Sequence, residues 1–447
     1  MFIYANSPDE KSTSAQISAG AYRTNITPAI GCSLQGSFDD VRATEILDDL
    51  YANALVLSDG ISQMALISVD LCEVDNATYR SIVAEIEKTL GIPQDHVLLA
   101  ATHTHHGPYI GNSIVANAEV TSYYVEHFKK QVLSAAAMAQ KRMQPVSVSA
   151  GKADNPDYVF NRRLRKPEGG IVMNWIDPIY LQNTQPSGPV DPQLIAIRFD
   201  DERGQPVAYI INYANHNNAV TGTGISADIS GYMGDLLRKI YGPELIVIFL
   251  LGACGNVNWL DWRNPDHWNK DHYKDIATGL TGTVLEITAR MEPCPADQLK
   301  IAHRTLNISE RPYNDIDTHV DDTFGDEADV FFEVYKAARA EAEGKPLPVH
   351  QVGLYVLRIG LQIAIVTSPN ELFCDFGLAI KAGSPFKYTL VSELTNGAMG
   401  YIPTQQAFQE GGYEIRKLPG NSFLALDAGE QTVAASLELL KQLSESG

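Results

Sequence analysis

The sequence predicts an α/β fold in which mixed β-sheets are flanked by helices, and two observations lead to that class. The first is a strand, a helix and a second strand between residues 63 and 101, since such a unit normally places its strands in parallel. The second is a set of later apolar runs that each end abruptly in polar residues. Open α/β sheets bind ligands outside the carboxyl ends of their strands, so we expect the functional site there.

The individual elements follow from residue periodicity. Residues 63–69 form an apolar run, and residues 76–90 carry apolar side chains at helical spacing before Gly91 ends the helix. Residues 97–101 form the second strand of this unit. The further expected elements are a helix at 121–141, strands at 207–213, 245–251, 361–367 and 388–391, and a closing helix at 431–443.

Composition narrows the class of protein. The chain has 447 residues, of which 45% are hydrophobic, and a formal net charge of −20, which disfavours nucleic acid and anionic membrane surfaces as partners. No apolar stretch is long enough to span a bilayer, and residues 1–16 lack the features of a secretory signal, so we expect a cytoplasmic protein. Five cysteines without framework spacing predict no structural disulfide. The expected partner is a small-molecule substrate.

We expect one catalytic domain over residues 1–447, with 1–18 as an N-terminal extension. Residues 310–348 differ in composition and predict a peripheral acidic insertion or lid, with a helix at 328–343. Their spacing does not fit an EF-hand calcium loop, so a solvated acidic face is the expected role. The acidic residues concerned are Asp315, Asp317, Asp321, Asp322, Asp326 and Glu327.

The most informative motif is Thr-His-Thr-His-His-Gly-Pro at residues 102–108, directly after the 97–101 strand. Residues two apart in an extended chain point to the same side, so His103 and His105 should face one cavity while His106 turns away. Imidazole is the commonest metal ligand and is well suited to proton transfer near neutral pH. The motif therefore favours a metal-assisted reaction, with a loop held by backbone hydrogen bonds as the alternative.

Other strands also end in groups that bind metals or transfer protons. His216 follows the 207–213 strand, Glu371 follows the 361–367 strand, and Glu393 and Tyr401 follow the 388–391 strand. The 245–251 strand leads into the loop Gly-Ala-Cys-Gly-Asn-Val-Asn at 252–258. Strand ends of one sheet region converge in space, so together they predict one site more strongly than any motif alone.

In their order along the chain, several segments resemble the catalytic domain of the neutral/alkaline ceramidase family. The resemblance runs from about residue 20 to residue 413, and the 101–108 element is its most specific part. The other segments are Asp-Asp-Leu-Tyr-Ala-Asn-Ala-Leu-Val-Leu at 48–57, Asn-Arg-Arg at 161–163, Ile-Ser-Ala-Asp at 225–228, the 252–258 loop, and Gly-Tyr-Ile-Pro-Thr at 400–404.

The resemblance implies hydrolysis of an N-acyl amide bond with one zinc ion held by His103, His216, Glu371 and Tyr401. It leaves His105 off the metal, as a proton donor or substrate contact. It also places Arg162 near the scissile carbonyl, where a guanidinium stabilises developing negative charge; an ordinary salt-bridged arginine is the alternative. Asp70 and Asp228 are expected to orient imidazoles or anchor loops, and carboxylates are expected at the far imidazole nitrogens.

The sequence departs from that family at two points. Where ceramidases carry a serine important for activity, this chain has Asn258, and an aspartate of the same loop is Asn256. An amide is no nucleophile, although Asn258 can donate a hydrogen bond to an oxyanion. The chain also ends before the immunoglobulin-like C-terminal domain of ceramidases, so no such domain is expected.

Aromatic residues crowd the stretch after Asn258. They predict either a wall that stacks on a substrate or an ordinary packed loop core. The residues assigned to substrate contacts are Trp259, Trp262 and His106, and Trp268 and Tyr273 belong to the same aromatic stretch.

The leading hypothesis is a zinc-dependent hydrolase of an amide in an N-acylated substrate, with metal-bound hydroxide as the nucleophile. The alternatives are a zinc enzyme that acts on an ester, a lactone or a carbohydrate-like substrate, and a non-catalytic binding protein on the same fold. Two other classes with a His-x-His motif are disfavoured. The metallo-β-lactamase type needs an aspartate where Gly107 stands, and the amidohydrolase barrel needs the motif on its first strand.

Overall fold

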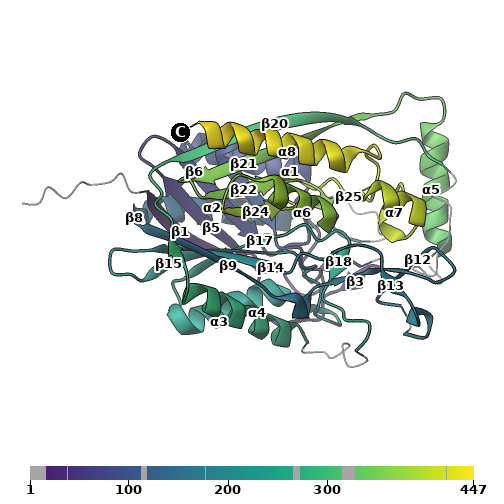
Figure 1. Cartoon of the computed structure of the whole chain (residues 1–447), viewed down its shortest axis with the longest axis horizontal. Coiled ribbons are helices and arrows are strands. Elements are labelled where there is room, and N and C mark those ends of the chain that lie inside the picture. Colours follow the sequence, from purple (N-terminus) through teal and green to yellow (C-terminus); the bar gives the residue numbers. More distant parts are fainter. Residues whose placement is uncertain are drawn as a thin grey trace, which may run out of the picture.

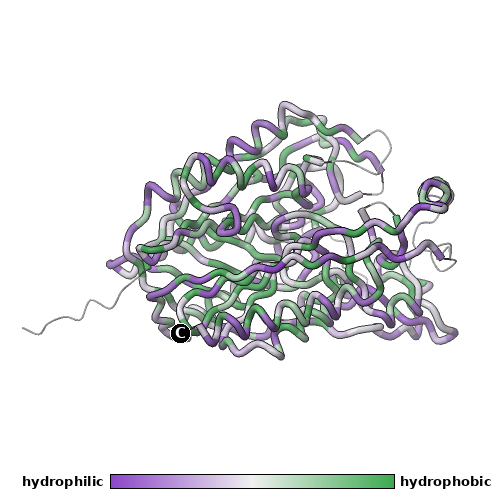
Figure 2. Tube along the Cα trace, turned by 90° about the horizontal axis from the view of Figure 1, so that it is seen from above, coloured by the Kyte–Doolittle hydropathy of each residue, from purple (hydrophilic) through white to green (hydrophobic). Residues whose placement is uncertain are grey.

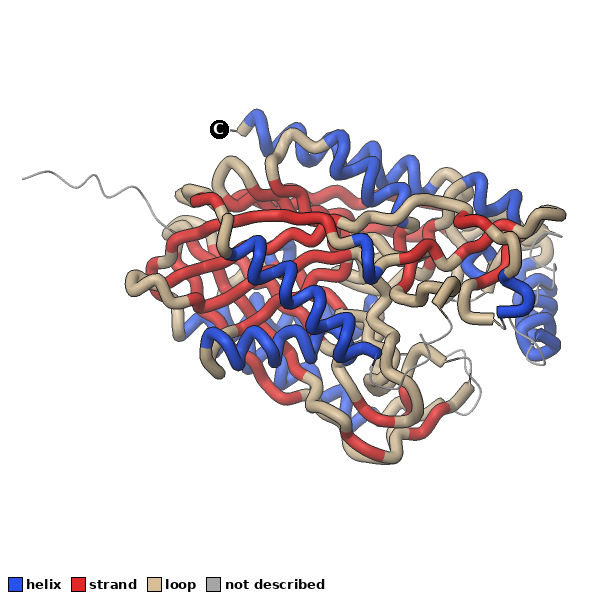
Figure 3. The backbone as a smooth tube through the Cα atoms, turned by 60° about the horizontal axis from the view of Figure 1, so that its bottom comes forward, coloured by secondary structure: helices blue, strands red, loops and turns tan. Residues whose placement is uncertain are grey.

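Three β-sheets, each covered on its outer side by helices, surround a shared apolar core (Figures 1 and 3). The computed structural model describes residues 17–37, 39–111, 118–176, 178–264, 272–314, 328–418 and 420–446. Figure 2 shows the same arrangement as apolar strands inside and polar segments on the outer helices and loops. The α/β class with mixed sheets and flanking helices is confirmed.

The first sheet carries the predicted strand–helix–strand unit. Its order is β7 (Val97–Ala101), β6 (Gln63–Val69), β5 (Tyr51–Ser58), β1 (Ser18–Asn25) and β8 (Gln144–Pro145), and its outer helices are α1 (Asn76–Leu90) and α2 (Ser122–Lys141). Strands β6 and β7 pair in parallel, as predicted. Asp75 caps the start of α1 by accepting hydrogen bonds from two backbone N–H groups, and Gly91 ends that helix with φ of 72°.

The second sheet repeats this plan. Its order is β17 (Ile246–Leu251), β15 (Pro206–Tyr213), β14 (Gln193–Asp200), β9 (Ser147–Asp154) and β19 (Glu292–Pro293), and its outer helices are α3 (Asp228–Tyr241) and α4 (His272–Thr288). Strands β15 and β17 pair in parallel, whereas β14 and β9 are antiparallel. The two strands that lead into His216 and into the 252–258 loop are therefore neighbours.

The third sheet has the order β20 (Leu299–Ser309), β21 (Val349–Ile359), β22 (Ile363–Thr367) and β24 (Tyr388–Ser392), covered by α6 (Cys374–Gly383) and α8 (Ala428–Glu445). Strands β20 and β21 form a long antiparallel hairpin, and residues 310–348 connect its two strands at one end. Helix α5 (Ala328–Ala342) stands at that end of the molecule (Figure 1). The predicted aspartates of this segment, Glu327 and most of the predicted N-terminal extension lie outside the described residues.

The sheets are buried on both faces, which explains why their strands read as continuous apolar runs. In β17, Ile248 and Leu250 point into the shared core between the sheets, whereas Val247 and Phe249 pack beneath α3 and α4. The same alternation holds along β6 and β22. The predicted elements agree with the observed bounds to within three residues.

Short strands complete the fold and bring loops together. They are β2 (Ser33–Leu34) with β3 (Val41–Arg42), β4 (Glu45–Ile46) with β16 (Gly224–Ile225), β10 (Phe160–Asn161) with β18 (Val257–Asn258), β11 (Arg163–Arg165) with β12 (Ile171–Met173) and β13 (Gln185–Pro186), and β23 (Glu371–Leu372) with β25 (Tyr401–Ile402). Helix α7 (Gln405–Glu410) follows β25. Across the described ranges, no helix combines the length and apolarity needed to cross a membrane.

Candidate metal centre

Three imidazoles converge where β7 and β15 end. The Nε2 atom of His103 lies 3.1 Å from that of His216 and 3.3 Å from that of His105. His103 and His216 are almost fully buried. The prediction that His103 and His105 share one cavity is confirmed, and so is the opposite orientation of His106. His216, which was also predicted to join this site, comes from a different sheet.

Hydrogen bonds at the opposite ring nitrogens define the tautomers. The Nδ1 atoms of His103, His105 and His216 lie 2.8–3.1 Å from backbone carbonyl oxygens, respectively those of Cys72, Gly36 and Cys254. A carbonyl only accepts, so each Nδ1 carries the proton and each Nε2 presents a lone pair. Burial lowers the pKa of His103 to about 4 and holds the pKa values of the other two well below 6.5, so all three rings are neutral.

Glu371 supplies an oxygen to the same point. Its Oε2 lies 3.5 Å from His103 Nε2 and 3.7 Å from His216 Nε2, and this buried atom has no hydrogen-bond partner among the described residues. Burial raises the pKa of Glu371 to about 7, although the positive charge of Arg162 opposes this shift. Within the described part of the chain, no cation hydrogen-bonds to Glu371 Oε2, whereas Arg162 donates to His216 Nε2.

Tyr401 stands next to Glu371 because β23 and β25 pair in parallel with these two residues in register. Its ring is buried, and its hydroxyl accepts a hydrogen bond from the Tyr413 hydroxyl at 3.3 Å. A hydrogen bond from Tyr401 also lowers the pKa of Glu371, which places the phenol oxygen beside the carboxylate. Glu371 and Tyr401 are thus 30 positions apart in the chain but adjacent in the structure.

The donor set fits a zinc ion. A tetrahedral zinc with metal–nitrogen distances of about 2.0–2.1 Å separates its ligand atoms by roughly 3.3 Å, close to the spacing of these nitrogen and oxygen atoms. The donor atoms of His103, His216 and Glu371 all lie within 4.8 Å of one another. His105 falls outside that set but forms a second one with His103 and Cys72, so geometry alone leaves it as an alternative ligand.

Arg162 forms the wall of the centre. Its buried guanidinium donates to His216 Nε2 at 3.0 Å, to Glu414 at 2.9 Å and to the Gly255 carbonyl at 2.8 Å. Although burial opposes the charge, Tyr401 and Glu414 outweigh that effect and raise the pKa of Arg162 further. The arginine is therefore a fixed positive charge at the edge of the site. It is also held by a salt bridge to Glu414, as the alternative from the sequence expected, whereas its place near a scissile carbonyl stays a prediction.

The backbone at His103 is strained. Its φ is 65°, in the left-handed region that a non-glycine residue seldom adopts. The conformation is held because the His103 N–H donates to Leu71 O and the preceding Thr102 N–H donates to Val69 O. Strain of this kind persists where the surroundings over-determine it, and it is typical of functional sites.

Gly36 is a site residue that sequence reasoning missed. Its φ is 109°, and a Cβ added there would lie 2.4 Å from the His105 ring, whose Nδ1 is 3.0 Å from the Gly36 carbonyl. We expect Gly36→Ala to displace His105 while His103 and His216 keep the metal. The purified variant should contain as much metal as the unmodified protein and should turn over substrate more slowly. As a control, Gly60→Ala changes a glycine with φ of 84° that has no neighbour within 4 Å. Equal activity of the two variants would contradict the expected role.

The expectation of carboxylates behind the imidazoles is wrong. Main-chain carbonyls occupy those positions, and two buried thiols accompany them: Cys72 Sγ lies 3.6 Å from His103 Nδ1, and Cys254 Sγ lies 3.4 Å from His216 Nδ1. Asp70 instead accepts from the Tyr51 N–H and the Thr102 hydroxyl. Asp228 accepts from the N–H groups of Val220 and Ile229. Both aspartates anchor loops, which was the other role expected of them.

The expected substrate contacts are not brought to the centre. His106 is buried with its ring nitrogens 2.7 and 3.0 Å from the carbonyl oxygens of Gly224 and Val220. Trp259 is part of the core beneath α4, and its Nε1–H donates to Asn218. Trp262 packs on Phe160 and on the small cluster around β11 and β12. Trp268 lies outside the described residues, and Tyr273 is buried in the same core as Trp259.

Asn258 is engaged elsewhere too. Its amide exchanges hydrogen bonds with the amide of Asn174, at 2.8 and 3.0 Å, and its carbonyl oxygen also accepts from the Leu260 N–H. This pairing holds the loop after β18 and leaves the predicted oxyanion role without support. Asn256 has a comparable structural task, because its side-chain oxygen accepts from the N–H of Cys374 at the start of α6.

Glu393 is a second residue whose role the sequence did not reveal. Fully buried, it accepts hydrogen bonds from the backbone N–H groups of Cys254 and Leu372, at 3.1 and 2.9 Å, and from the Cys254 thiol at 2.9 Å. Cys254 orients His216 through its carbonyl, and Leu372 follows Glu371. Glu393 therefore joins the two segments that carry candidate ligands.

Comparisons with known proteins agree with this geometry. Residues 19–243, half of the chain, match the model of the N-terminal part of the neutral/alkaline non-lysosomal ceramidases. Neutral ceramidase of Pseudomonas aeruginosa is 26% identical over 285 residues, 59% of this chain and 40% of that protein. Neutral ceramidase A of Dictyostelium discoideum is 25% identical over 199 residues, 42% of this chain and 27% of that protein. The matches thus span less than half the length of these relatives.

Solved structures support the fold. The crystal structure of neutral ceramidase from Pseudomonas aeruginosa superposes with a TM-score of 0.74 at 18% identity, over 96% of this chain and 75% of that chain. A ceramidase complexed with C2 gives a TM-score of 0.73 at 17% identity, over 96% and 76% of the two chains. With the motif order, the family match and the shared fold in agreement, the chain belongs to the neutral/alkaline non-lysosomal ceramidase family.

Proposed function

We propose that this protein is a zinc-dependent hydrolase that cleaves the amide bond of an N-acylated substrate, with His103, His216, Glu371 and Tyr401 as metal ligands. One observation carries the proposal. Lone pairs of neutral imidazoles and a carboxylate oxygen with no hydrogen-bond partner among the described residues meet at a buried point, where Arg162 donates to His216 Nε2 and a bound cation would join all of these donors. Membership of the ceramidase family favours an amide as the bond that is cleaved.

A bound zinc ion would supply Lewis acidity, which polarises a carbonyl and makes water a stronger acid. Arg162 provides the complementary positive charge from the protein. Its guanidinium is held by Glu414 and the Gly255 carbonyl, so it needs no reorganisation when negative charge develops on the substrate oxygen.

His105 is the residue best placed to move a proton. Its Nδ1–H is held by the Gly36 carbonyl, and its Nε2 lies 3.3 Å from that of His103, directed at the candidate centre. In this role Nε2 takes the proton from the attacking water and gives it to the leaving nitrogen. No serine stands in the 252–258 loop, so the proposal includes no acyl-enzyme on that loop.

The test combines metal analysis with a substrate panel. The purified protein should hold about one zinc per chain and hydrolyse N-acyl amides faster than matched esters, lactones or glycosides. His105→Ala should keep the zinc and lose about 10²–10⁴-fold in turnover, the usual contribution of general acid–base catalysis. The control is His303→Ala, an exposed histidine on β20. Zinc-loaded protein that is inactive on the whole panel would favour the binding-protein alternative.

A further inference from the structure

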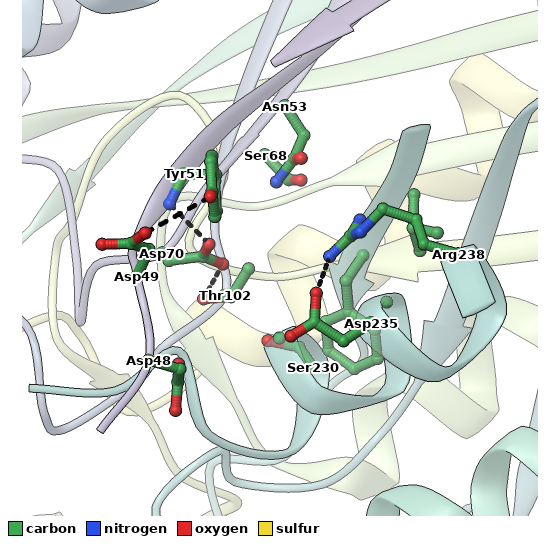
Figure 4. A pocket seen from close by; sticks show the side chains of 14 residues that line it. Asp48, Asp49, Tyr51, Asn53, Ser68, Asp70, Thr102, Ser230, Asp235 and Arg238 are labelled. Atoms are coloured by element: carbon green, nitrogen blue, oxygen red, sulfur yellow. Dashed lines mark hydrogen bonds and ion pairs between the residues drawn. The ribbon is translucent and has the colours of Figure 1, made fainter. Parts of the chain in front are cut away.

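A second, polar cavity of about 240 Å³ lies behind the histidine motif (Figure 4). Its walls are the loop before β5, the strands β5 and β6, the residues that follow β6 and β7, and the face of α3 that runs from Ser230 to Arg238, with Val247 and Phe249 of β17 as an apolar floor. None of the candidate metal ligands lines it. Thr102, which does, directly precedes His103 in the chain.

The charge of this cavity is negative. Among the described residues that line it are four carboxylates and one cationic side chain, that of Arg238, whose guanidinium is paired with Asp235 at 2.6 Å. The remaining carboxylates form no salt bridge within the described part of the chain; they are those of Asp48, Asp49 and Asp70. The nearby Arg23 guanidinium lies over the Tyr51 ring at 4.0 Å and is not part of the lining. A ligand for this cavity must therefore bring positive charge.

A buried hydroxyl points independently to a ligand. Ser68 is fully buried and lines the cavity, yet its Oγ has no hydrogen-bond partner among the described residues. An unsatisfied buried hydroxyl is costly to the folded state, so such a group is usually matched by a partner that enters the site. Asn53 is paired with Ser68 in the β5–β6 register, and Figure 4 shows the two side chains together at the end of the cavity opposite Asp48.

The size of the cavity and the spacing of its carboxylates decide whether a metal ion or an organic cation suits it better. Among the described residues, sets of three carboxylate, imidazole or thiol donors close enough to share one metal occur at the candidate metal centre and not here. The cavity has the volume of about eight water molecules at roughly 30 Å³ each. Its carboxylates are therefore spread around a space that suits a small molecule better than a single ion.

We propose that this cavity binds a small aliphatic amine. The ammonium group contacts the buried Asp70 carboxylate, the other carboxylates around the cavity add negative charge, and the carbon chain lies on Val247 and Phe249. A second polar group of the ligand reaches Ser68. The net charge of −20 further favours the approach of a cation. Burial raises the pKa values of Asp48 to about 6 and of Asp70 to about 7, although the charge of Arg238 lowers the latter. The site is independent of the proposed hydrolase activity.

The test is calorimetric titration of the full chain with 1,4-diaminobutane, with 1,4-butanediol as a neutral analogue of the same length and with calcium ions. The diamine should bind and the diol should not. Asp235→Asn, at the half-exposed rim, should weaken diamine binding about threefold, and Asp70→Asn about tenfold or more, because it removes a buried charged acceptor. Asp154→Asn, an exposed residue at the end of β9, is the matched control and should bind as the unmodified protein does.

Each possible result of the titration contradicts a different part of the proposal. Equal binding of diol and diamine would overturn recognition by charge, and displacement of the diamine by calcium at comparable concentration would overturn the choice of an organic cation. Absence of diamine binding, or unchanged binding in both Asp70→Asn and Asp235→Asn, would overturn the site itself. Since Asp70 also anchors Thr102, circular dichroism of Asp70→Asn verifies that it folds, and Asp235→Asn tests the proposal if it does not.

Discussion

Replacing His103 or His216 with Ala should abolish zinc binding and, with it, hydrolysis of any substrate. Each substitution removes one of two buried imidazoles whose Nε2 atoms lie 3.1 Å apart, and leaves Glu371 facing an incomplete donor set. Loss of one ligand from such a set removes the geometry that a tetrahedral zinc requires. Metal content after gel filtration, measured by mass spectrometry, reports the effect directly.

His105→Ala is the informative comparison for these variants, because His105 is as close to His103 as His216 is. Zinc retained in His105→Ala and lost in His216→Ala would assign the ligand set proposed above. The reverse pattern would instead assign the set that contains His103, His105 and Cys72. Full zinc occupancy in His103→Ala would refute both sets, since they share this residue.

Glu414→Ala should cause the largest loss of stability of any single carboxylate removal at the site, about 3–5 kcal/mol. The Glu414 side chain is fully buried between the guanidiniums of Arg162 and Arg163, at 2.9 and 2.5 Å. Its removal leaves two buried positive charges without their shared partner. Urea unfolding followed by circular dichroism measures the change in the free energy of unfolding.

The control for Glu414 is a surface pair. Glu438→Ala removes the partner of Arg304 at a position where both side chains are exposed to solvent, and it should cost less than about 1 kcal/mol. Equal destabilisation by the two substitutions would show that the buried pair contributes no more than a surface one. A Glu414→Gln variant that keeps its fold but turns over slowly would show that the carboxylate also positions Arg162 for catalysis.

The sequence was a good guide to the strands and helices because the physics that forms them is local. Strands such as β17 are buried on both faces and therefore consist of unbroken apolar residues. The ends of α1 are marked in the sequence by Asp75 before its first residue and by Gly91 after its last. The β20–β21 hairpin escaped prediction, as did the strands β1, β5, β9 and β14 and the helices α3, α4 and α6. The strands of the hairpin carry exposed residues in irregular alternation, and its two halves are separated by the 310–348 segment.

The candidate site likewise has residues that the sequence singled out and residues whose roles it did not reveal. Its imidazole and carboxylate groups stand at strand ends, so residue type and position were enough to single them out. The groups that hold them in place could not be found from residue type, because they act through the backbone or through long-range packing. Gly36 is 69 residues from His105, and Glu393 is 139 residues from Cys254. Trp259 shows the opposite error. It was assigned to substrate contacts because it is an aromatic residue near a functional loop, but its side chain is part of the core.

Main-chain carbonyls behind the imidazoles make the nitrogen donors insensitive to mutation. Every amino acid at positions 72 or 254 offers the same carbonyl oxygen, so substitutions there that preserve the backbone path leave the tautomers of His103 and His216 unchanged. Position 36 is the exception, because a Cβ there would meet the His105 ring. A histidine backed by a carboxylate would instead become a stronger or weaker donor as that side chain varied. The electron density donated to a bound cation is therefore adjusted through the oxygen donors, Glu371 and Tyr401. The residues that hydrogen-bond to these two side chains take part in the same adjustment.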